Sequence, residues 1–171
     1  MVNLTLMVGI PGVGKSTAAA KMAQEENTLW VSRDTIRFSM VAENEEYFSR
    51  EAEVFDTFAR EIAARLFCGY NVVADATHIT VKSRAKTINA VKHGLKLMSG
   101  NENYLEENVE LQACVVRKSL EKTLEQNENR RGTRSYVPKS VIRRMNEQFE
   151  DISTEENFKT VIRIKEKDDN E

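Results

Sequence analysis

The sequence alternates between short apolar runs and longer stretches whose apolar positions recur every three or four residues. Apolar runs of strand length occupy residues 4–8, 27–32, 70–75, 109–116 and 158–164. Helical patterns occupy residues 17–24, 35–41, 47–68, 119–127 and 138–149, and a further helix is expected to begin after Thr77 or Thr80 and to end near Lys92. Because strands alternate with helices, the pattern predicts an α/β fold, with a five-stranded parallel sheet sandwiched by helices.

The longest helical pattern runs from Tyr47 to Cys68. Its apolar positions are Phe48, Ala52, Phe55, Phe58 or Ala59, Ile62 and Leu66, and Gly69 follows as a stop signal. The spacing places these side chains on one face of a helix. We interpret this aromatic stripe as core packing rather than as a binding surface.

Two segments lack a regular pattern. Residues 94–108 are polar and contain Ser99-Gly100-Asn101, so we expect a surface insertion there. Residues 129–137 form a basic loop that carries Arg130, Arg131 and Arg134. This loop lies between two predicted helices, and we expect it to act as a mobile lid.

Composition sets broad limits on the protein class. The length of 171 residues predicts one domain over residues 1–164, followed by a charged, frayed tail over residues 165–171. The formal net charge of −2 argues neither for nor against a nucleic-acid partner, so any basic patch must be local. Cys68 and Cys114 lie in apolar stretches and are expected to be reduced core thiols. Neither a membrane span nor a signal peptide is evident, so we expect a cytoplasmic protein without membrane contact.

A glycine-rich segment near the start carries the strongest chemical signal. Gly9-Ile10-Pro11-Gly12-Val13-Gly14-Lys15-Ser16 fits G-x-x-x-x-G-K-[ST] and lies between a predicted strand and a predicted helix. In that context backbone N–H groups and the helix N-terminus can surround a polyphosphate. The residues expected to bind ATP are Gly9, Pro11, Gly12, Val13, Gly14, Lys15, Ser16 and Thr17. Lys15 would reach the β- and γ-phosphates, and the Ser16 hydroxyl would ligate Mg²⁺.

Other polar side chains follow the remaining strands, at the edge of a parallel sheet where ligands gather. Asp34 is the candidate general base, one helical turn before Arg37, which could hold an anionic acceptor. Asp75 ends an apolar strand and is placed for Mg²⁺ or its water shell. Arg130 or Arg131 could close over the phosphates and stabilise the transferring group. The alternative interpretations are that Asp34 only caps its helix and that the arginine loop is a solvated turn.

The order and spacing of several segments match a known family. These segments are Gly9 to Thr17, Ser32-Arg33-Asp34-Thr35-Ile36-Arg37, Asp75-Ala76-Thr77-His78, Asn127 to Gly132 and Val137-Pro138. Over roughly residues 4–149 the chain resembles the 5′-kinase domain of phage and bacterial polynucleotide kinases. That domain belongs to the small P-loop kinases, which include zeta-toxin-like enzymes.

The resemblance implies an ATP-dependent kinase that phosphorylates the 5′-hydroxyl of DNA or RNA. It implies that Lys15 and Ser16 hold ATP and its metal, and that Asp34 activates the 5′-hydroxyl. It further implies that Arg37 contacts the neighbouring phosphate of the acceptor and that Asp75 organises the active site.

The chain also departs from the family pattern. His78 stands where the family often has Asn, which puts the role of that position in doubt. The Arg-Asn-x-x-Arg pattern appears as Gln126-Asn127-Glu128-Asn129-Arg130, so the arginine that contacts the γ-phosphate could be Arg130 or Arg131. The Asp-x-Asp-x-Thr motif of the family's phosphatase domain is absent from the sequence, so no 3′-phosphatase activity is expected.

Two other functions stay open. A kinase of the same fold could act on a small molecule such as a nucleoside, a sugar or a nucleotide-sugar, because no aromatic residue in the predicted acceptor region requires base stacking. A nucleotide-binding module without an acceptor is the second possibility. The sequence lacks the Asn/Thr-Lys-x-Asp motif with which a GTPase switch would read guanine, and it indicates no oligomeric state.

Overall fold

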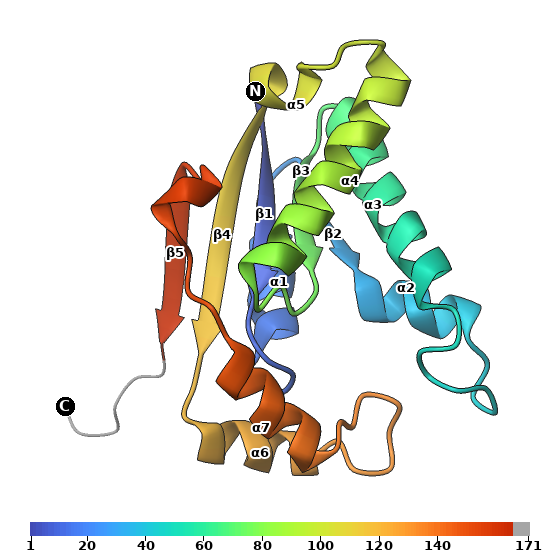
Figure 1. The fold of residues 1–171 in the computed structure, drawn as a ribbon, viewed down its shortest axis with the longest axis vertical. Coiled ribbons are helices and arrows are strands. Elements are labelled where there is room, and N and C mark those ends of the chain that lie inside the picture. The colour runs from blue at the N-terminus through green and yellow to red at the C-terminus, as the bar shows by residue number, and fades with distance from the viewer. Residues whose placement is uncertain (166–171) are drawn as a thin grey trace.

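The computed structural model describes residues 1–165, which form one parallel sheet with helices on both faces (Figure 1). The strands lie in the order β2–β3–β1–β4–β5 and are β1 (Val2–Val8), β2 (Thr28–Ser32), β3 (Asn71–Asp75), β4 (Val109–Arg117) and β5 (Thr160–Lys165). The helices are α1 (Lys15–Met22), α2 (Arg33–Met40), α3 (Glu51–Phe67), α4 (Val81–Ser99), α5 (Tyr104–Asn108), α6 (Leu120–Glu128) and α7 (Lys139–Gln148), and a 3₁₀ helix (Thr154–Glu156) precedes β5. The architecture confirms the predicted α/β fold with five parallel strands.

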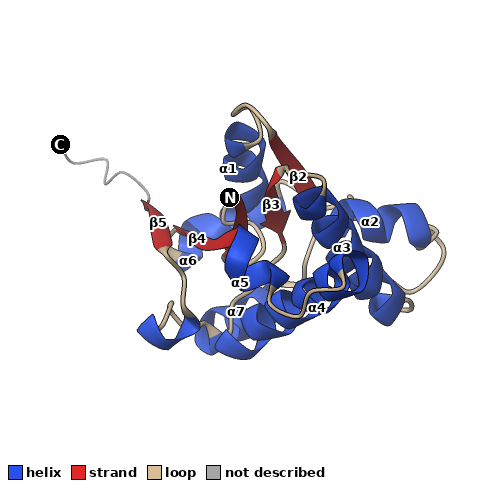
Figure 2. Cartoon of the chain, turned by 90° about the horizontal axis from the view of Figure 1, so that it is seen from above, coloured by secondary structure: helices blue, strands red, loops and turns tan. Residues whose placement is uncertain are grey.

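The sheet separates two hydrophobic cores. Helices α3 and α4 cover one face, and α1 covers the other (Figure 2). Successive side chains of a strand point to opposite faces. Leu4 and Leu6 of β1 therefore join the α3–α4 core, whereas Met7 packs in the core that contains Ala19 of α1. All four side chains are fully buried, which fixes β1 at the centre of the domain.

The strand order determines where a ligand can bind. Strand β1 pairs with β3 on one side and with β4 on the other, so the order of the strands reverses at β1. In such sheets ligands bind beyond the carboxyl ends of the strands, close to the reversal. The segments that follow β1, β2, β3 and β4 emerge at this edge, at the lower end of the sheet in Figure 1, near α2, α6 and α7.

The prediction of an irregular insertion over residues 94–108 is wrong. Helix α4 continues to Ser99, and α5 occupies the rest of the segment. Gly94 does not end the helix: a Cβ at this position would lie 2.9 Å from the Cβ of Ala63 on α3, so the glycine lets the two helices approach closely. Leu95 and Leu105 are buried in the core beneath.

The prediction of one helix from residue 47 also needs correction. Helix α3 begins at Glu51, and residues 41–50 form the connection from α2. The stripe within the helix is buried as predicted, at Val54, Phe55, Phe58, Ala59, Ile62 and Leu66. Phe48 lies before the helix and is 60% exposed, so it does not belong to the core.

The two cysteines occupy different environments. Cys114 on β4 is buried, and burial raises the pKa of its thiol to about 11, which agrees with an inert core thiol. Cys68 follows the last residue of α3 and is exposed, so the expectation of a core thiol is wrong for this residue. The apolar stripe of α3 ends at Leu66, and the chain turns away from the core at Gly69.

A buried arginine fixes the start of α4. The Arg84 side chain is fully buried, and its Nε lies 2.6 Å from a carboxylate oxygen of Glu156. It also donates to the carbonyl oxygens of His78, Glu150 and Asp151, at 2.9, 3.0 and 3.1 Å. A buried charge is costly unless it is fully paired. This network therefore ties the loop after β3 to the segment between α7 and β5.

Strand β5 closes one edge of the sheet. It extends through Lys165, and the rest of the predicted tail, residues 166–171, lies outside the described residues. All six side chains of β5 are exposed, as befits an edge strand. Across residues 1–165, none of the helices combines the length and the apolar character required to cross a membrane.

Candidate functional site

The segment Gly9–Ser16, here called the phosphate loop, connects β1 to α1. Gly12 and Gly14 adopt left-handed backbone conformations, with φ of 86° and 99°, which side chains other than glycine rarely allow. Gly14 caps α1 without a side-chain hydrogen bond, which leaves the first N–H groups of the helix accessible to an anion. Ile10 and Val13 are buried in the core below, so the loop has a fixed base.

Lys15 lies at the centre of the site. Its Nζ donates a hydrogen bond to the carbonyl oxygen of Ile10 at 2.9 Å. Burial lowers the pKa of the amine to about 8, the carboxylates of Asp75 and Asp34 oppose this shift, and the guanidinium of Arg130 adds to it. These three charged groups thus lie within electrostatic reach of Lys15. The structure brings together four residues that the sequence places on four different segments.

Ser16 and Asp75 are in direct contact. The Ser16 hydroxyl donates to Oδ2 of Asp75 at 2.9 Å, and the indole Nε1 of Trp30 donates to the same oxygen at 3.2 Å. Asp75 is 6% exposed, and burial raises the pKa of its carboxyl, while Lys15 acts in the opposite direction. The two predicted metal ligands are therefore neighbours in space.

This pair fits the chemistry of Mg²⁺. The ion usually takes one or two protein ligands and completes its octahedron with water and phosphate oxygens. A hydroxyl next to a carboxylate provides such a partial set. Within the described part of the chain, no cluster of three or more His, Cys, Asp or Glu could hold a metal ion alone. The donor set therefore fits an ion shared with a bound triphosphate.

Asp34 stands on the first turn of α2, where its carboxylate remains open to a ligand. Ser32 rather than Asp34 caps this helix, because its hydroxyl accepts a hydrogen bond from the Thr35 backbone N–H at 3.2 Å. The Asp34 side chain is 59% exposed. Its Oδ1 accepts from the Tyr47 hydroxyl at 2.9 Å and from the guanidinium of Arg37.

Arg37 connects Asp34 to the neighbouring side chains. It is 5% exposed and makes five hydrogen bonds, to Asp34, to Tyr47 and, through Nε and Nη2, to both carboxylate oxygens of Glu51. The Nη2 distances to Glu51 are 2.6 and 2.8 Å. We call Asp34, Arg37, Tyr47 and Glu51 the acceptor cluster. Its bonds join α2 to the start of α3 and hold the Asp34 carboxylate in place.

Arg33 borders the acceptor cluster. Its guanidinium lies 5.3 Å from the ring centroid of Phe55, and its Nη2 lies 3.8 Å from Glu51. Among residues 1–165, Nε of Arg33 is the buried side-chain polar atom that lacks a hydrogen-bond partner. With two arginines facing Asp34 and Glu51, the charges around the candidate base nearly compensate each other.

The two candidate arginines of the basic loop lie differently. Arg131 turns back to Glu128, with 2.9 Å between Nε and a carboxylate oxygen, and its guanidinium lies 5.3 Å from the ring centroid of Tyr136. Arg130 is the one whose charge acts on Lys15. Of the two arginines, it is Arg130 that lowers the pKa of the lysine in the phosphate loop.

The basic loop is fixed at both ends in the structure. At its start, the buried Asn127 side chain donates to the carbonyl oxygen of Val137 at 2.7 Å and accepts from its N–H at 3.0 Å. Further along, Arg134 donates to the carbonyl oxygen of Val41, and its guanidinium lies 4.7 Å from the ring centroid of Phe38. The loop thereby connects α6 to the end of α2. Its mobility as a lid stays a prediction.

His78 is buried between β1 and α4. It is 3% exposed, with Nδ1 at 2.9 Å from the carbonyl oxygen of Met7 and Nε2 at 3.0 Å from the Thr87 hydroxyl. Burial lowers the pKa of the imidazole to about 4, so the ring is neutral at pH 7. A neutral ring donates to the carbonyl and accepts from the hydroxyl, which links β1 to α4.

Sequence reasoning missed three residues of the site: Trp30, Tyr47 and Glu51. Trp30 could have been found from strand alternation, because it shares a face of β2 with Ser32, whose register partner is Asp75. Tyr47 and Glu51 gave no such local signal. Their contacts with Arg37 depend on how the connection before α3 folds back.

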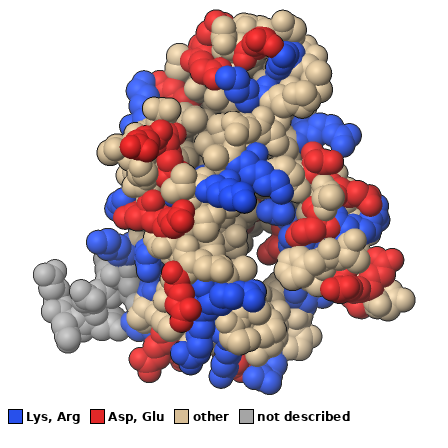
Figure 3. Space-filling model, in the orientation of Figure 1, with Lys and Arg blue, Asp and Glu red and all other residues tan. Residues whose placement is uncertain are grey.

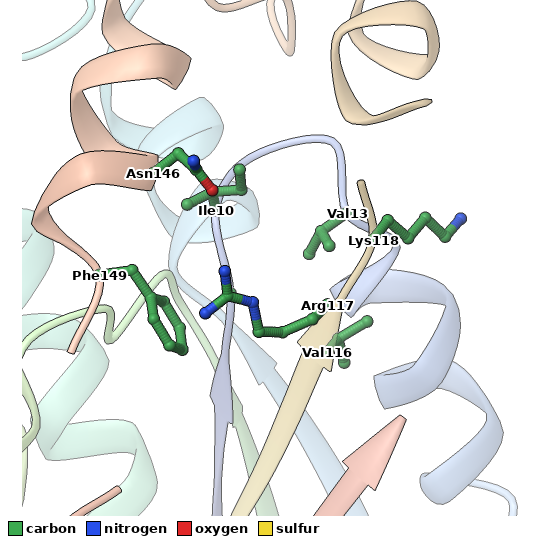
Figure 4. A pocket seen from close by; sticks show the side chains of 8 residues that line it. Ile10, Val13, Val116, Arg117, Lys118, Asn146 and Phe149 are labelled. Atoms are coloured by element: carbon green, nitrogen blue, oxygen red, sulfur yellow. The ribbon is translucent and has the colours of Figure 1, made fainter. Parts of the chain in front are cut away.

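Two further views show the surroundings of the phosphate loop. A small pocket lies between this loop and the end of β4, lined by Gly9, Ile10, Val13, Val116, Arg117, Lys118, Asn146 and Phe149 (Figure 4). Within it the Arg117 guanidinium lies 4.0 Å from the ring centroid of Phe149.

Figure 3 shows an opening between the α2 side of the molecule and the base formed by α6 and α7, where blue side chains gather. The active edge is thus open to solvent on this face.

Comparisons with known proteins indicate the family and the fold of this chain. Residues 4–152 match the AAA domain family. One chain of the Pnkp1/Rnl/Hen1 RNA repair complex is similar at a TM-score of 0.67 and 23% identity, over 86% of this chain and 43% of that chain. This chain therefore spans less than half the length of that relative. Among curated proteins, none matches the sequence.

Other solved structures share the fold at lower identity. A fungal RNA kinase has a TM-score of 0.67 at 12% identity, over 99% of this chain and 77% of that chain. A sugar kinase from Janibacter sp. HTCC2649 has a TM-score of 0.64 at 13% identity, over 96% of this chain and 86% of that chain. These similarities confirm the P-loop kinase fold, and they agree with the resemblance to polynucleotide kinases.

Proposed function

We propose that this chain, which belongs to the AAA domain family, is an ATP-dependent kinase that phosphorylates the 5′-hydroxyl of a polynucleotide. The observation that carries the proposal is the position of Asp34. Its exposed carboxylate lies within electrostatic reach of Lys15, and two hydrogen-bond donors of the acceptor cluster fix its orientation. A carboxylate held in place near a phosphate-binding lysine suits base-assisted phosphoryl transfer.

On the donor side, the phosphate loop would bind the triphosphate of ATP. Lys15 would leave the carbonyl oxygen of Ile10 and contact the β- and γ-phosphates. Ser16 and Asp75 would hold Mg²⁺, which when bound neutralises charge on the phosphate oxygens. Trp30 would keep the Asp75 carboxylate oriented through its indole hydrogen bond.

On the acceptor side, Asp34 would take the proton of the attacking hydroxyl. The hydroxyl oxygen forms a bond to the γ-phosphorus, the bond to the β–γ bridging oxygen breaks, and ADP leaves. Arg37 would hold Asp34 and contact the neighbouring phosphate of the acceptor. Because Arg37 already makes five hydrogen bonds, that phosphate would replace part of its pairing with Glu51.

Arg130 would complete the charge stabilisation. Negative charge spreads over the equatorial oxygens of the transferring phosphoryl group, where a cation lowers the energy of the transition state. Arg130 lies close enough to act on Lys15, whereas Arg131 pairs with Glu128. We therefore assign the γ-phosphate contact to Arg130.

A kinase of a small-molecule hydroxyl is the second candidate. The near-compensation of charge among Arg33, Asp34, Arg37 and Glu51 favours it, because an uncharged acceptor would not have to displace Glu51. The exposed glutamates of the connection between α2 and α3 at residues 43, 45 and 46 add negative charge nearby. A sugar or nucleoside would suit such a surface.

Labelled transfer separates the two candidates. Purified protein with γ-labelled ATP and Mg²⁺ is offered a 5′-hydroxyl DNA or RNA oligonucleotide, the same oligonucleotide already 5′-phosphorylated, and a set of nucleosides and sugars. We expect label on the 5′-hydroxyl oligonucleotide and none on its phosphorylated control. Label on a sugar or nucleoside with none on either oligonucleotide would reject the polynucleotide acceptor.

A further inference from the structure

Phe48 is a large apolar side chain next to the candidate base. It lies in the connection between α2 and α3 and is 60% exposed, more than Phe67 at 42% on the last turn of α3. A single exposed apolar residue needs no explanation by itself. The surroundings of this ring distinguish it.

The Phe48 ring is held by the acceptor cluster. Its centroid lies 4.7 Å from that of Tyr47, with the ring planes at 89°, and the Arg37 guanidinium lies 5.4 Å from it. Tyr47 in turn donates to Asp34 at 2.9 Å. The residues that orient the candidate base thus also orient Phe48, and they leave most of the ring exposed to solvent.

An oriented, exposed aromatic ring next to a 5′-hydroxyl site suits one chemical group in particular. Nucleobases stack on aromatic side chains, and this contact tolerates any base because each has a flat face. We propose that Phe48 stacks against the first base of the acceptor and sets the preference for a nucleobase-bearing 5′ end. This inference rests on the proposed polynucleotide kinase function.

The charges around the ring indicate how the rest of the acceptor lies. The connection that carries Phe48 exposes glutamates at residues 43, 45 and 46, which repel phosphates. The basic loop adjoins the other side of the aromatic group, because Arg134 lies over Phe38 and the Phe38 ring lies 6.2 Å from that of Tyr47. One base therefore stacks on Phe48 while the phosphates run toward the basic loop.

A second possible role for Phe48 is to shield the Arg37–Asp34 pair from water. Shielding would act on every acceptor equally, whereas stacking acts only on an acceptor that carries a base. Two oligonucleotides distinguish these roles. One has a normal 5′-hydroxyl end, and the other has the same sequence with an abasic first nucleotide.

The experiment compares the wild type with Phe48→Ala, Phe48→Leu and the matched control Phe67→Ala. For the normal oligonucleotide we expect both Phe48 substitutions to raise the acceptor KM by about tenfold or more, and Phe67→Ala to have no effect. The abasic oligonucleotide should show a raised KM with the wild type and no further rise in the Phe48 variants. The KM for ATP should be the same throughout. Circular dichroism checks folding, which removal of a mostly exposed ring should preserve.

Four outcomes would overturn the inference. A wild type that phosphorylates both oligonucleotides with equal KM would reject base stacking and leave the kinase function intact. An equal KM rise for both oligonucleotides in Phe48→Ala would indicate that Phe48 shields the Arg37–Asp34 pair from water. A wild-type KM in Phe48→Leu would indicate that any apolar side chain of similar size serves at this position. Transfer to a small molecule with none to either oligonucleotide would reject the proposed function and the stacking with it.

Discussion

The phosphate loop and the acceptor cluster meet at the carboxyl edge of the sheet, but different kinds of contact build them. The phosphate loop is one continuous segment whose shape comes from two left-handed glycines and the start of α1. The acceptor cluster is made of side-chain bonds between α2 and residues 10 to 14 positions further along the chain. Backbone geometry survives most substitutions, whereas a side-chain network changes with any member. Acceptor preference can therefore change while phosphate binding stays the same.

The largest expected effect on the donor side comes from Lys15→Ala. The variant loses a cation that acts directly on the phosphates, so kcat/KM for ATP should fall by about 10³-fold, with acceptor binding unchanged. Lys21→Ala, at the exposed end of the same helix, is the matched control and should behave like the wild type. Steady-state kinetics with both substrates varied measure this. An equal loss of acceptor binding would show that the phosphate loop and the acceptor cluster do not act independently.

The next prediction tests the basic loop. Arg130→Ala should lower kcat by about 10²-fold, because it removes positive charge from the transferring phosphoryl group. Arg131→Ala should leave kcat close to the wild-type value, since this side chain pairs with Glu128 at the surface. Single-turnover transfer rates of the two variants give the comparison directly. The reverse ranking would show that the loop rearranges when nucleotide binds.

A smaller effect is expected at the acceptor cluster from Glu51→Gln. The substitution weakens the paired contact with Arg37, so Asp34 is held less firmly and the transfer rate kcat should fall roughly tenfold. The KM for ATP should not change, because Glu51 has no contact with the phosphate loop among the hydrogen bonds of the described residues. Glu53→Gln, on the same helical turn, is the control. A rise in the KM for ATP would contradict the independence of the phosphate loop and the acceptor cluster.

The acceptor cluster also shows which parts of the site could not be predicted from the sequence. The motif Gly9–Ser16 and the strand ends gave the phosphate loop, Asp34 and Asp75, because these signals are local or follow from the edge rule of parallel sheets. Glu51 and Tyr47 could not be found, since their pairing with Arg37 requires the connection before α3 to fold back onto α2.

The fold shows the same limit. Strand and helix positions followed from periodicity, but the helix predicted to end near Lys92 continues past Gly94, which serves close packing against Ala63. The spacing of Phe48 continues the stripe of α3 and predicts a core position, but the helix begins only at Glu51 and the Phe48 side chain is exposed. Local patterns do not distinguish a glycine that ends a helix from one that lets two helices touch.

A pH dependence of stability is expected from His78, which links β1 to α4. The pKa of His78 is lowered to about 4 in the folded protein, from 6.5 in the unfolded chain, so the unfolded state binds more protons between these values. The free energy of unfolding should fall by about 3 kcal/mol as the pH drops from 6.5 to 4. Urea unfolding at several pH values measures this for the wild type.

The two histidines provide a matched pair for this test. His78→Asn should flatten the fall in stability between pH 6.5 and 4, because it removes the titrating group. His93→Asn should leave the slope unchanged, since His93 is exposed on α4. An unchanged slope in His78→Asn would assign the pH dependence to other groups.

The central claim is that Asp34 is the base of a kinase acting on a 5′-hydroxyl. Its most direct test is the rate of transfer from γ-labelled ATP to a 5′-hydroxyl oligonucleotide, with Asp34→Asn beside the wild type and Asp56→Asn, an exposed acid on α3, as the control. Asn keeps the acceptor oxygen for Tyr47 and Arg37 but cannot take a proton. The fluorescence of Trp30, the single tryptophan of the chain, reports whether nucleotide still binds next to Asp75.

The account predicts that Asp34→Asn binds ATP like the wild type and transfers its phosphate about 10²–10⁴-fold more slowly, while Asp56→Asn is unaffected. Transfer at the wild-type rate in Asp34→Asn would contradict the account and leave Asp34 only a structural partner of Arg37.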